Sequence, residues 1–221
     1  MRTRAAAFAL VLVGVGIGLD AQTPSSTTGA QAGDGSKYEA LVQRVVNGDK
    51  TVDFTELRTA FTETPQYDQL KVLGMALYQG LWAALVQQNF PEALDRAKSA
   101  IARDFVEVNA HMVASMAYDR TGDAERAAFH RFVANGLLNS IRSSGDGKTE
   151  ATAFHVVSIS EEYALVVRAM GMRPVIVGSR LPRNGEHGYD SFVAADRQTG
   201  TERTFYFNID AMYTSRPKSG P

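Results

Sequence analysis

The hydrophobic pattern of this chain changes its period near Ile141, and this change constrains the fold more than any other feature. Before it, apolar side chains recur every three or four residues, as at Tyr38, Leu41 and Val45, which is typical of helices packed on one face. After it, runs of β-branched and aromatic residues are separated by turn residues, which is typical of strands. Helices followed by strands predict an α+β protein and argue against a parallel α/β sheet.

We expect helical hairpins over residues 36–142 to pack with a β-rich region over residues 143–213 in one compact unit. The second region has the order β-α-β-β-β, and its four-stranded sheet should be mainly antiparallel because short turns join the last three strands. The expected elements are a strand at 153–159, a helix at 161–170 and strands at 174–181, 189–195 and 201–209. Residues 214–221 are expected to form a disordered tail.

The helical region contains an internal repeat. Residues 71–104 align with residues 105–138, an offset of 34, and three pairs of alanines coincide: Ala83 with Ala117, Ala93 with Ala127, and Ala100 with Ala134. This period, with small residues where two helices approach closely, resembles two tetratricopeptide repeats. Such repeats expose a groove for peptides or partner proteins, and the candidate groove residues are Tyr78, Gln79 and Arg120.

The first residues predict export. Two arginines precede an uncharged, mostly apolar run over residues 5–19, and Ala21 supplies the small residue that a cleavage site needs. We therefore expect a signal peptide at 1–21, cleaved after Ala21, and a flexible linker at 22–35, giving a secreted or periplasmic protein. The apolar run is shorter than the ~20 residues of a membrane span, so no span is expected after cleavage.

Composition excludes several classes of function. The chain has no cysteine, so it has no disulfide framework, thiolate metal site or cysteine nucleophile. Its formal net charge is −1; removal of residues 1–21 takes Lys+Arg from 23 to 21 and Asp+Glu from 24 to 23, which gives −2. This balanced and scattered charge argues against nucleic acid as a partner. The four histidines show no close metal-ligand spacing, and neither a metal nor a cofactor is predicted.

Four motifs outside the repeat identify a resemblance. They are Gly48-Asp49 with Asp53-Phe54-x-x-Leu57-Arg58, Ser144-Gly145-Asp146-Gly147-Lys148, Ser160-Glu161-Glu162-Tyr163, and Tyr206-Phe207-Asn208-Ile209-Asp210. Together they resemble a family of exported bacterial proteins that is known only as a domain of unknown function. The resemblance covers the span from about Tyr38 to Asp210 and implies an exported globular protein, without supplying a reaction, a ligand or a catalytic residue.

Polar residues in or beside these motifs form the candidate site, between the helical and β parts. They are Asp146, Lys148, His155, Glu161, Glu162 and Asn208. Paired carboxylates can perform acid–base chemistry when their pKa values differ, and His155 precedes them on a predicted strand.

Each feature of this site also has a structural explanation. The glycines around Asp146 suit a tight helix-to-strand turn, and the glycine of a phosphate loop is missing six residues before Lys148. Ser158 and Glu161 have the spacing of a capping box, and neighbouring residues on a helix point about 100° apart. His187 is assigned to a glycine-rich turn.

These patterns favour a non-enzymatic module that binds or assembles with a peptide or another protein of the cell envelope. No residue is assigned a catalytic role. A hydrolase-type enzyme with a site between the helical and β parts is the first alternative, and a structural envelope protein is the second.

Overall fold

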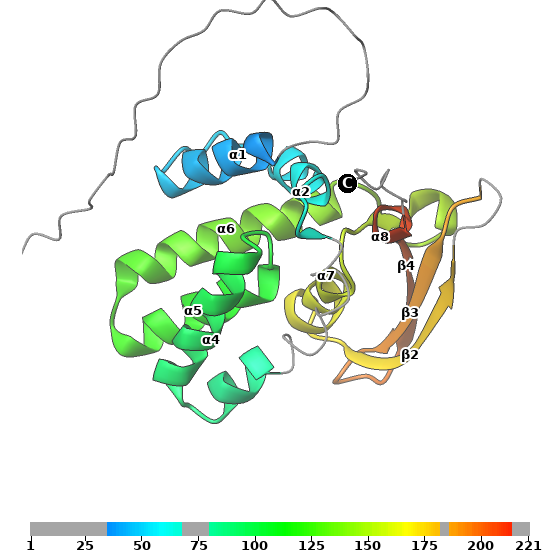
Figure 1. Cartoon of the computed structure of the whole chain (residues 1–221). Helices are drawn as coiled ribbons and strands as arrows, with labels where there is room; N and C mark the ends of the chain where they lie inside the picture. The colour runs from blue at the N-terminus through cyan, green and yellow to red at the C-terminus, as the bar shows by residue number, and fades with distance from the viewer. Residues whose placement is uncertain (1–34, 68–79, 182–185, 214–221) are drawn as a thin grey trace, which may run out of the picture. The chain divides into compact units, whose positions relative to one another are not determined.

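Helices fill the N-terminal half of the protein and a four-stranded sheet lies in the C-terminal part (Figure 1). This computed structural model describes residues 35–67, 80–181 and 186–213, all of which belong to one unit, Gln31–Pro221. The helices are α1 (Ser36–Val46), α2 (Phe54–Thr62), α4 (Phe90–Arg103), α5 (Val108–Thr121), α6 (Ala124–Arg142), η1 (Glu150–Thr152), α7 (Ile159–Tyr163), η2 (Ala164–Ala169) and α8 (Asp210–Tyr213). The strands are β1 (Phe154–His155), β2 (Arg173–Arg180), β3 (Tyr189–Ala195) and β4 (Glu202–Asn208). The α+β prediction is confirmed.

The helices begin at residues whose side chains satisfy free backbone N–H groups. Asp53 accepts hydrogen bonds from the N–H groups of the first turn of α2, Asn89 does so for α4, and Asp123 for α6. Pro91 occupies the first turn of α4, where its missing N–H has no cost. No helix among the described residues is long and apolar enough to cross a membrane.

The sheet has the strand order β1-β4-β3-β2, and β2, β3 and β4 form the antiparallel meander that the sequence predicts. Strand β1 pairs with β4 in parallel and contains two residues, whereas the sequence predicts a strand over residues 153–159. Side chains end the strand early. The Val157 N–H donates to Glu161 and the Val157 carbonyl accepts from Tyr67, so neither group is available to a strand ladder.

The helix predicted at 161–170 begins earlier, at Ile159, and changes geometry within its length. Residues of α7 are α-helical, and those of η2 form a π-helical turn. An apolar pattern of six residues does not distinguish the two kinds of helix, so the sequence did not predict this turn. In η2 the Arg168 guanidinium lies 3.9 Å from the centre of the Trp82 ring, a cation–π contact with the helical region.

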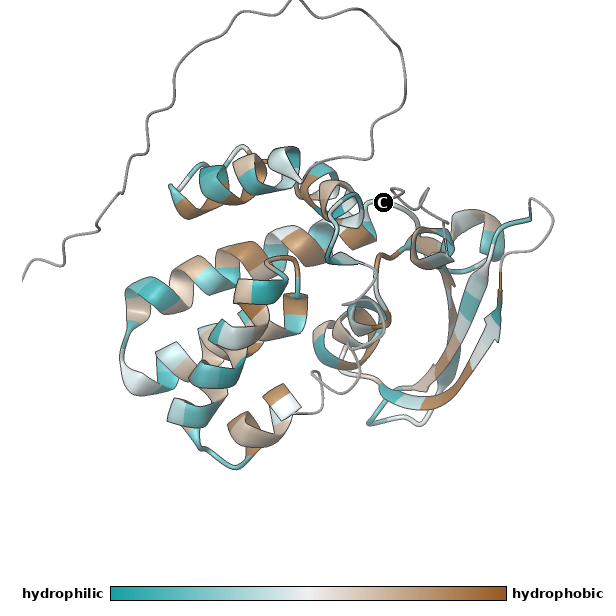
Figure 2. Ribbon diagram, viewed as in Figure 1, coloured by the Kyte–Doolittle hydropathy of each residue, from teal (hydrophilic) through white to brown (hydrophobic). Residues whose placement is uncertain are grey.

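Two groups of buried side chains form the core. The larger one joins α1, α2 and α6 to α7, η2 and the sheet, and it includes Phe61, Leu137, Leu165, Phe192 and Phe207. The smaller one is rich in alanine and fills the contacts of α4 with α5 and of α5 with α6. Figure 2 shows the corresponding alternation of apolar and polar residues along α1 and α6.

The alanines that define the internal repeat are largely buried. Ala93, Ala100, Ala117, Ala127 and Ala134 are buried, whereas Ala83 is exposed. Small buried residues allow the close approach of helices that the repeat requires. The likeness to tetratricopeptide repeats stays a prediction.

Two histidines form a neutral pair inside the helical region. The Phe105 carbonyl can only accept, so the His111 Nε2 donates to it at 2.9 Å, and the His111 Nδ1 accepts from the His130 Nδ1 at 3.0 Å. The His130 ring also stacks on Tyr118, with ring centres 5.6 Å apart. Burial lowers the pKa of His111 to about 3 and that of His130 to about 4.

This pair predicts a loss of stability in acid. Below about pH 6.5 the unfolded chain binds protons that the folded pair excludes, so stability falls as the pH decreases from 6.5 toward 4. His130→Phe keeps an aromatic ring against Tyr118 and removes one of the two titrating groups. We expect it to lower the dependence of the unfolding free energy on pH by about 1.4 kcal/mol per pH unit in this range. Urea denaturation at several pH values measures the dependence, and an unchanged value would contradict the neutral pair.

Candidate functional site

The register of the sheet brings one polar residue from each strand into a single row. Arg180 of β2 lies opposite Tyr189 of β3, Tyr189 opposite Asn208 of β4, and Asn208 opposite His155 of β1. Residues paired across neighbouring strands point to the same face, so these four side chains share one side of the sheet. The Arg180 guanidinium also lies 5.1 Å from the centre of the Tyr189 ring.

A cleft of about 650 Å³ opens beside this row. His155, Tyr189 and Asn208 line one side of it, together with the start of α8 and the loop before β3. Helix α2 lines the other side with the hydroxyl-bearing residues Thr55, Thr59 and Thr62. We call this space the α2–sheet cleft.

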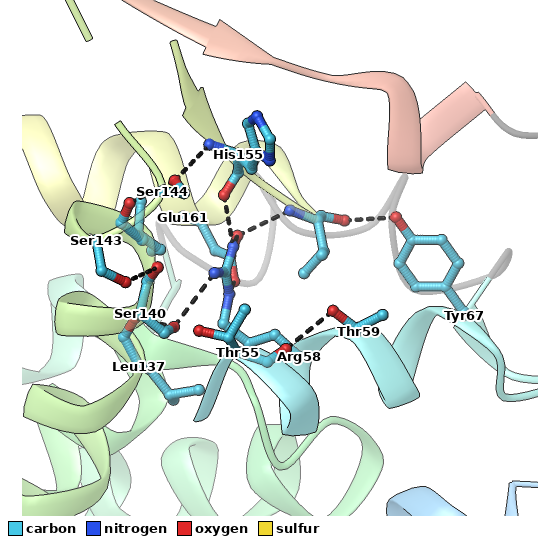
Figure 3. A network of polar contacts seen from close by, with 12 residues as sticks. Thr55, Arg58, Thr59, Tyr67, Leu137, Ser140, Ser143, Ser144, His155 and Glu161 are labelled. Carbon is cyan, nitrogen blue, oxygen red and sulfur yellow. Dashed lines mark hydrogen bonds and ion pairs between the residues drawn. The ribbon is translucent and has the colours of Figure 1, made fainter. Parts of the chain in front are cut away.

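Arg58 also lines this cleft and joins α2 to the β part (Figure 3). Its Nε and NH2 donate to the two carboxylate oxygens of Glu161, each at 2.7 Å. NH2 also donates to the His155 carbonyl at 2.8 Å, and NH1 donates to the Ser140 hydroxyl at 3.2 Å. Arg58 is 4% exposed and Glu161 is 2% exposed, so water hardly screens the attraction between the two charges.

At the rim of the cleft, His187 and Asp210 form a second polar pair. The His187 Nδ1 donates to Asp210 Oδ2, and the other oxygen of Asp210 accepts from the Gly188 N–H at 2.8 Å. Partial burial alone would raise the pKa of Asp210, but hydrogen bonds from Gly188, His187 and Asn208 outweigh it and hold the pKa below its usual range. The pair therefore presents a carboxylate that orients an imidazole through Nδ1, which leaves Nε2 as the ring nitrogen that can act on a ligand.

Of the six residues proposed from the sequence, the structure brings His155 and Asn208 together in the row. Glu161 lies behind the cleft on Arg58, and Glu162 is fully buried. The predicted capping box is wrong: the Ser158 side chain makes no capping hydrogen bond, and the Glu161 carboxylate binds Arg58 and the Val157 N–H.

Asp146 and Lys148 lie apart from the cleft, in the turn that follows α6. The Lys148 Nζ contacts Asp146 Oδ2 at 3.0 Å, and Asp146 Oδ1 accepts from the Lys148 N–H and the Thr152 hydroxyl. These contacts fit the tight-turn explanation. Gly147 has φ +67°, and a Cβ there would lie 2.3 Å from the Phe154 ring, so this turn requires glycine.

Only part of the candidate groove lies among the described residues. Tyr78 and Gln79 are outside them. Arg120 is exposed near the end of α5 and lines a hollow of about 200 Å³ with Phe90 and Met116.

Sequence reasoning did not place Arg58, His187 or Asp210 in the site. Arg58 and Asp210 stand inside two of the motifs quoted for the family resemblance, but the sequence alone does not show which residues they contact. His187 was assigned to its turn, and its contact with Asp210, 23 residues away, could not be read from spacing. Among the described residues, no group of three or more His, Asp or Glu side chains could hold a metal ion.

The ion pair between Arg58 and Glu161 should be strongly coupled. Removing either charge leaves the other buried without a partner, so we expect Arg58→Met and Glu161→Met each to lower the unfolding free energy by about 3–5 kcal/mol. The double variant leaves no unpaired charge and should lose less than the sum of the two. Urea denaturation of the unaltered protein, the two single variants and the double variant measures these losses of unfolding free energy. As a control, Lys37→Met breaks the exposed contact of Lys37 with Glu56 and should cost about 0–1 kcal/mol. Additive losses would contradict the coupling.

Comparisons with known proteins give one match. Searches of curated proteins and of solved structures found none. The family model of a domain of unknown function, DUF4919, matches residues 31–217, which include every described residue. The chain therefore belongs to the DUF4919 family.

Proposed function

We propose that the protein is a binding module of the cell envelope and that the α2–sheet cleft holds its ligand. The observation that carries this proposal is that neighbouring groups already hold the polar side chains around the cleft. Glu161 holds Arg58, His187 holds Asp210, and Glu150 pairs with Arg180 at 2.5 Å. A site ordered in advance loses less conformational entropy when it binds.

The chemistry of the cleft favours a short peptide. A peptide backbone presents donors and acceptors in alternation, and the cleft offers both through Asn208 and the threonine hydroxyls of α2. Its charged groups are held by neighbours: Glu161 binds Arg58, Arg180 binds Glu150, and His187 binds Asp210. The Tyr189 ring adds a flat apolar surface for a side chain.

Export supports the envelope as the place of action. The basic and apolar pattern of residues 1–21 predicts a signal peptide, and a cysteine-free chain needs no oxidative folding there. In this proposal the helical region, with its two tetratricopeptide-like repeats, is the scaffold that positions α2.

Binding to defined peptide pools tests the proposal. We expect the chain beginning at residue 22 to bind random hexapeptides, as measured by fluorescence anisotropy. Tyr189→Ala and Asn208→Ala should each weaken binding at least about tenfold, or about 1.4 kcal/mol, because they remove one wall of the cleft. Arg120→Ala, on the far hollow, should leave binding unchanged.

The same experiment separates the other interpretations. Binding that is lost in Arg120→Ala and kept in Tyr189→Ala would move the ligand to the helical groove. Self-association in sedimentation experiments without binding of any pool would instead support a structural envelope protein.

One observation favours a hydrolase as the second candidate. The pairing of His187 with Asp210 is the arrangement by which a carboxylate fixes an imidazole that acts through Nε2. His187 would take a proton from water as the water oxygen attacks a carbonyl carbon, and would return that proton to the leaving group as its bond to carbon breaks. Asn208 and Tyr189 line the same cleft and would face the developing oxyanion.

A panel of chromogenic esters and amides tests this candidate. If the cleft hydrolyses any of them, His187→Ala should lower kcat/KM by about 10²–10⁴-fold, since the general base is lost. Asp210→Asn should lower it too, and Arg120→Ala should not. Equal rates in His187→Ala and the unaltered protein would exclude this role for the pair.

A further inference from the structure

Behind the α2–sheet cleft lies a pair of acidic side chains, and no basic group in the described part of the chain neutralises this pair. Glu162 on α7 is 0% exposed and Asp190 on β3 is 5% exposed. Both carboxyl oxygens of Glu162 and Oδ1 of Asp190 have no hydrogen-bond donor among the described residues. Yet Asp190 lies within hydrogen-bonding reach of Glu162.

Two buried carboxylates cannot face each other without compensation. The cost of burying one unpaired charge is several kcal/mol, and a second like charge beside it adds repulsion. The charged groups acting on Glu162 are Asp190 from β3 and Glu161 from its own helix. The Arg58 guanidinium, from α2, is already bound to Glu161. Only a proton can turn this contact between two acceptors into a hydrogen bond.

We infer that Glu162 and Asp190 share one proton, that this proton joins α7 to β3, and that the shape of the α2–sheet cleft depends on it. The packing supports a contact between α7 and β3 here. The ring of Tyr163, the residue after Glu162, lies with its centre 5.0 Å from the centre of the Phe192 ring of β3. Burial, and after it the Asp190 charge, raises the pKa of Glu162 well above its usual range.

The positions of the two residues connect the pair to the cleft. Glu161, next to Glu162, holds Arg58 and the Val157 N–H. Tyr189, next to Asp190, lines the cleft. Loss of the proton would place two charges side by side and push α7 from β3, and both of these neighbours would move with their elements.

The proton predicts a fall in stability as the pH rises. Between the ordinary pKa of a glutamate, about 4.3, and the raised pKa of Glu162, the folded chain holds a proton that the unfolded chain has lost. Stability from this pair is therefore complete in acid and declines as the pH rises toward and through the raised pKa of Glu162. Glu107, which is buried beside Ser160, and Asp104, which is half-buried, have raised pKa values as well, so a difference between variants is needed to isolate the pair.

Glu162→Gln supplies that difference, because its amide can donate to Asp190 at every pH. We expect the Tm of Glu162→Gln minus that of the unaltered protein to increase with pH by about 3 °C for each pH unit above 5 over which the proton is held. Asp190→Asn should give a smaller increase, because it removes the Asp190 charge but leaves Glu162 buried. Glu125→Gln, which alters an exposed carboxylate on α6, should give a constant difference. A constant difference in both pair variants would overturn the shared proton.

Backbone amide signals in nuclear magnetic resonance spectra test the link to the cleft separately. We expect the Val157 and Tyr189 amides to follow the same pH step in the unaltered protein and not in Glu162→Gln. If the signals of these two amides do not change with the pH step, the coupling between the carboxyl pair and the cleft is overturned, whether or not the cleft binds peptides. A third measurement is the Tm in the presence of Ca²⁺ or Mg²⁺. A cation that raises the Tm of the unaltered protein but not that of Glu162→Gln would show that a metal ion, rather than a proton, lies between the two carboxylates.

Discussion

The buried bond between Arg58 and Glu161 is the interaction on which the arrangement of this protein depends. It joins two elements separated by 103 residues, and each of its ends organises further contacts. Arg58 fixes the His155 carbonyl at the end of β1, and Glu161 fixes the Val157 N–H that follows it. The bond therefore places α2 against the start of the sheet, and the α2–sheet cleft is the space between them that side chains leave unfilled.

Buried acidic groups accumulate around this bond. One guanidinium faces a region that holds Glu107, Glu161, Glu162 and Asp190, all of them buried. Arg58 neutralises Glu161, while the Ser160 hydroxyl and the Asn109 side chain hydrogen-bond to Glu107. Buried ion pairs are seldom a gain in stability over apolar packing, so such a concentration of charge is more consistent with a role in binding or proton control than with a role in the core.

The sequence predicted the features that depend on local pattern. Period and turn residues gave the helices, the meander of β2, β3 and β4, and the α+β class, because each is specified within about ten residues. Features that depend on distant contacts were missed. Strand β1 is short because Tyr67 and Glu161 take the backbone groups of Val157, and no local pattern around Val157 reveals either partner. For the same reason Glu161 was explained as a helix cap, and Arg58 was not assigned to the site.

The candidate site illustrates the same division. His155 and Asn208 were chosen for their residue types, and the register of β1 on β4 brings them together, which spacing alone could not establish across 53 residues. Asp146 and Lys148 were chosen for a motif whose glycines turn out to serve a turn packed on Phe154. What distinguishes the two outcomes is position: His155 and Asn208 line the cleft that α2 bounds on its other side, whereas Asp146 and Lys148 do not line it. The cleft between α2 and the sheet is lined by polar groups from both parts, whereas the hollow at Arg120 is lined mostly by apolar side chains. That difference is the physical reason to place the function of this protein at the junction of its two parts rather than along its helices.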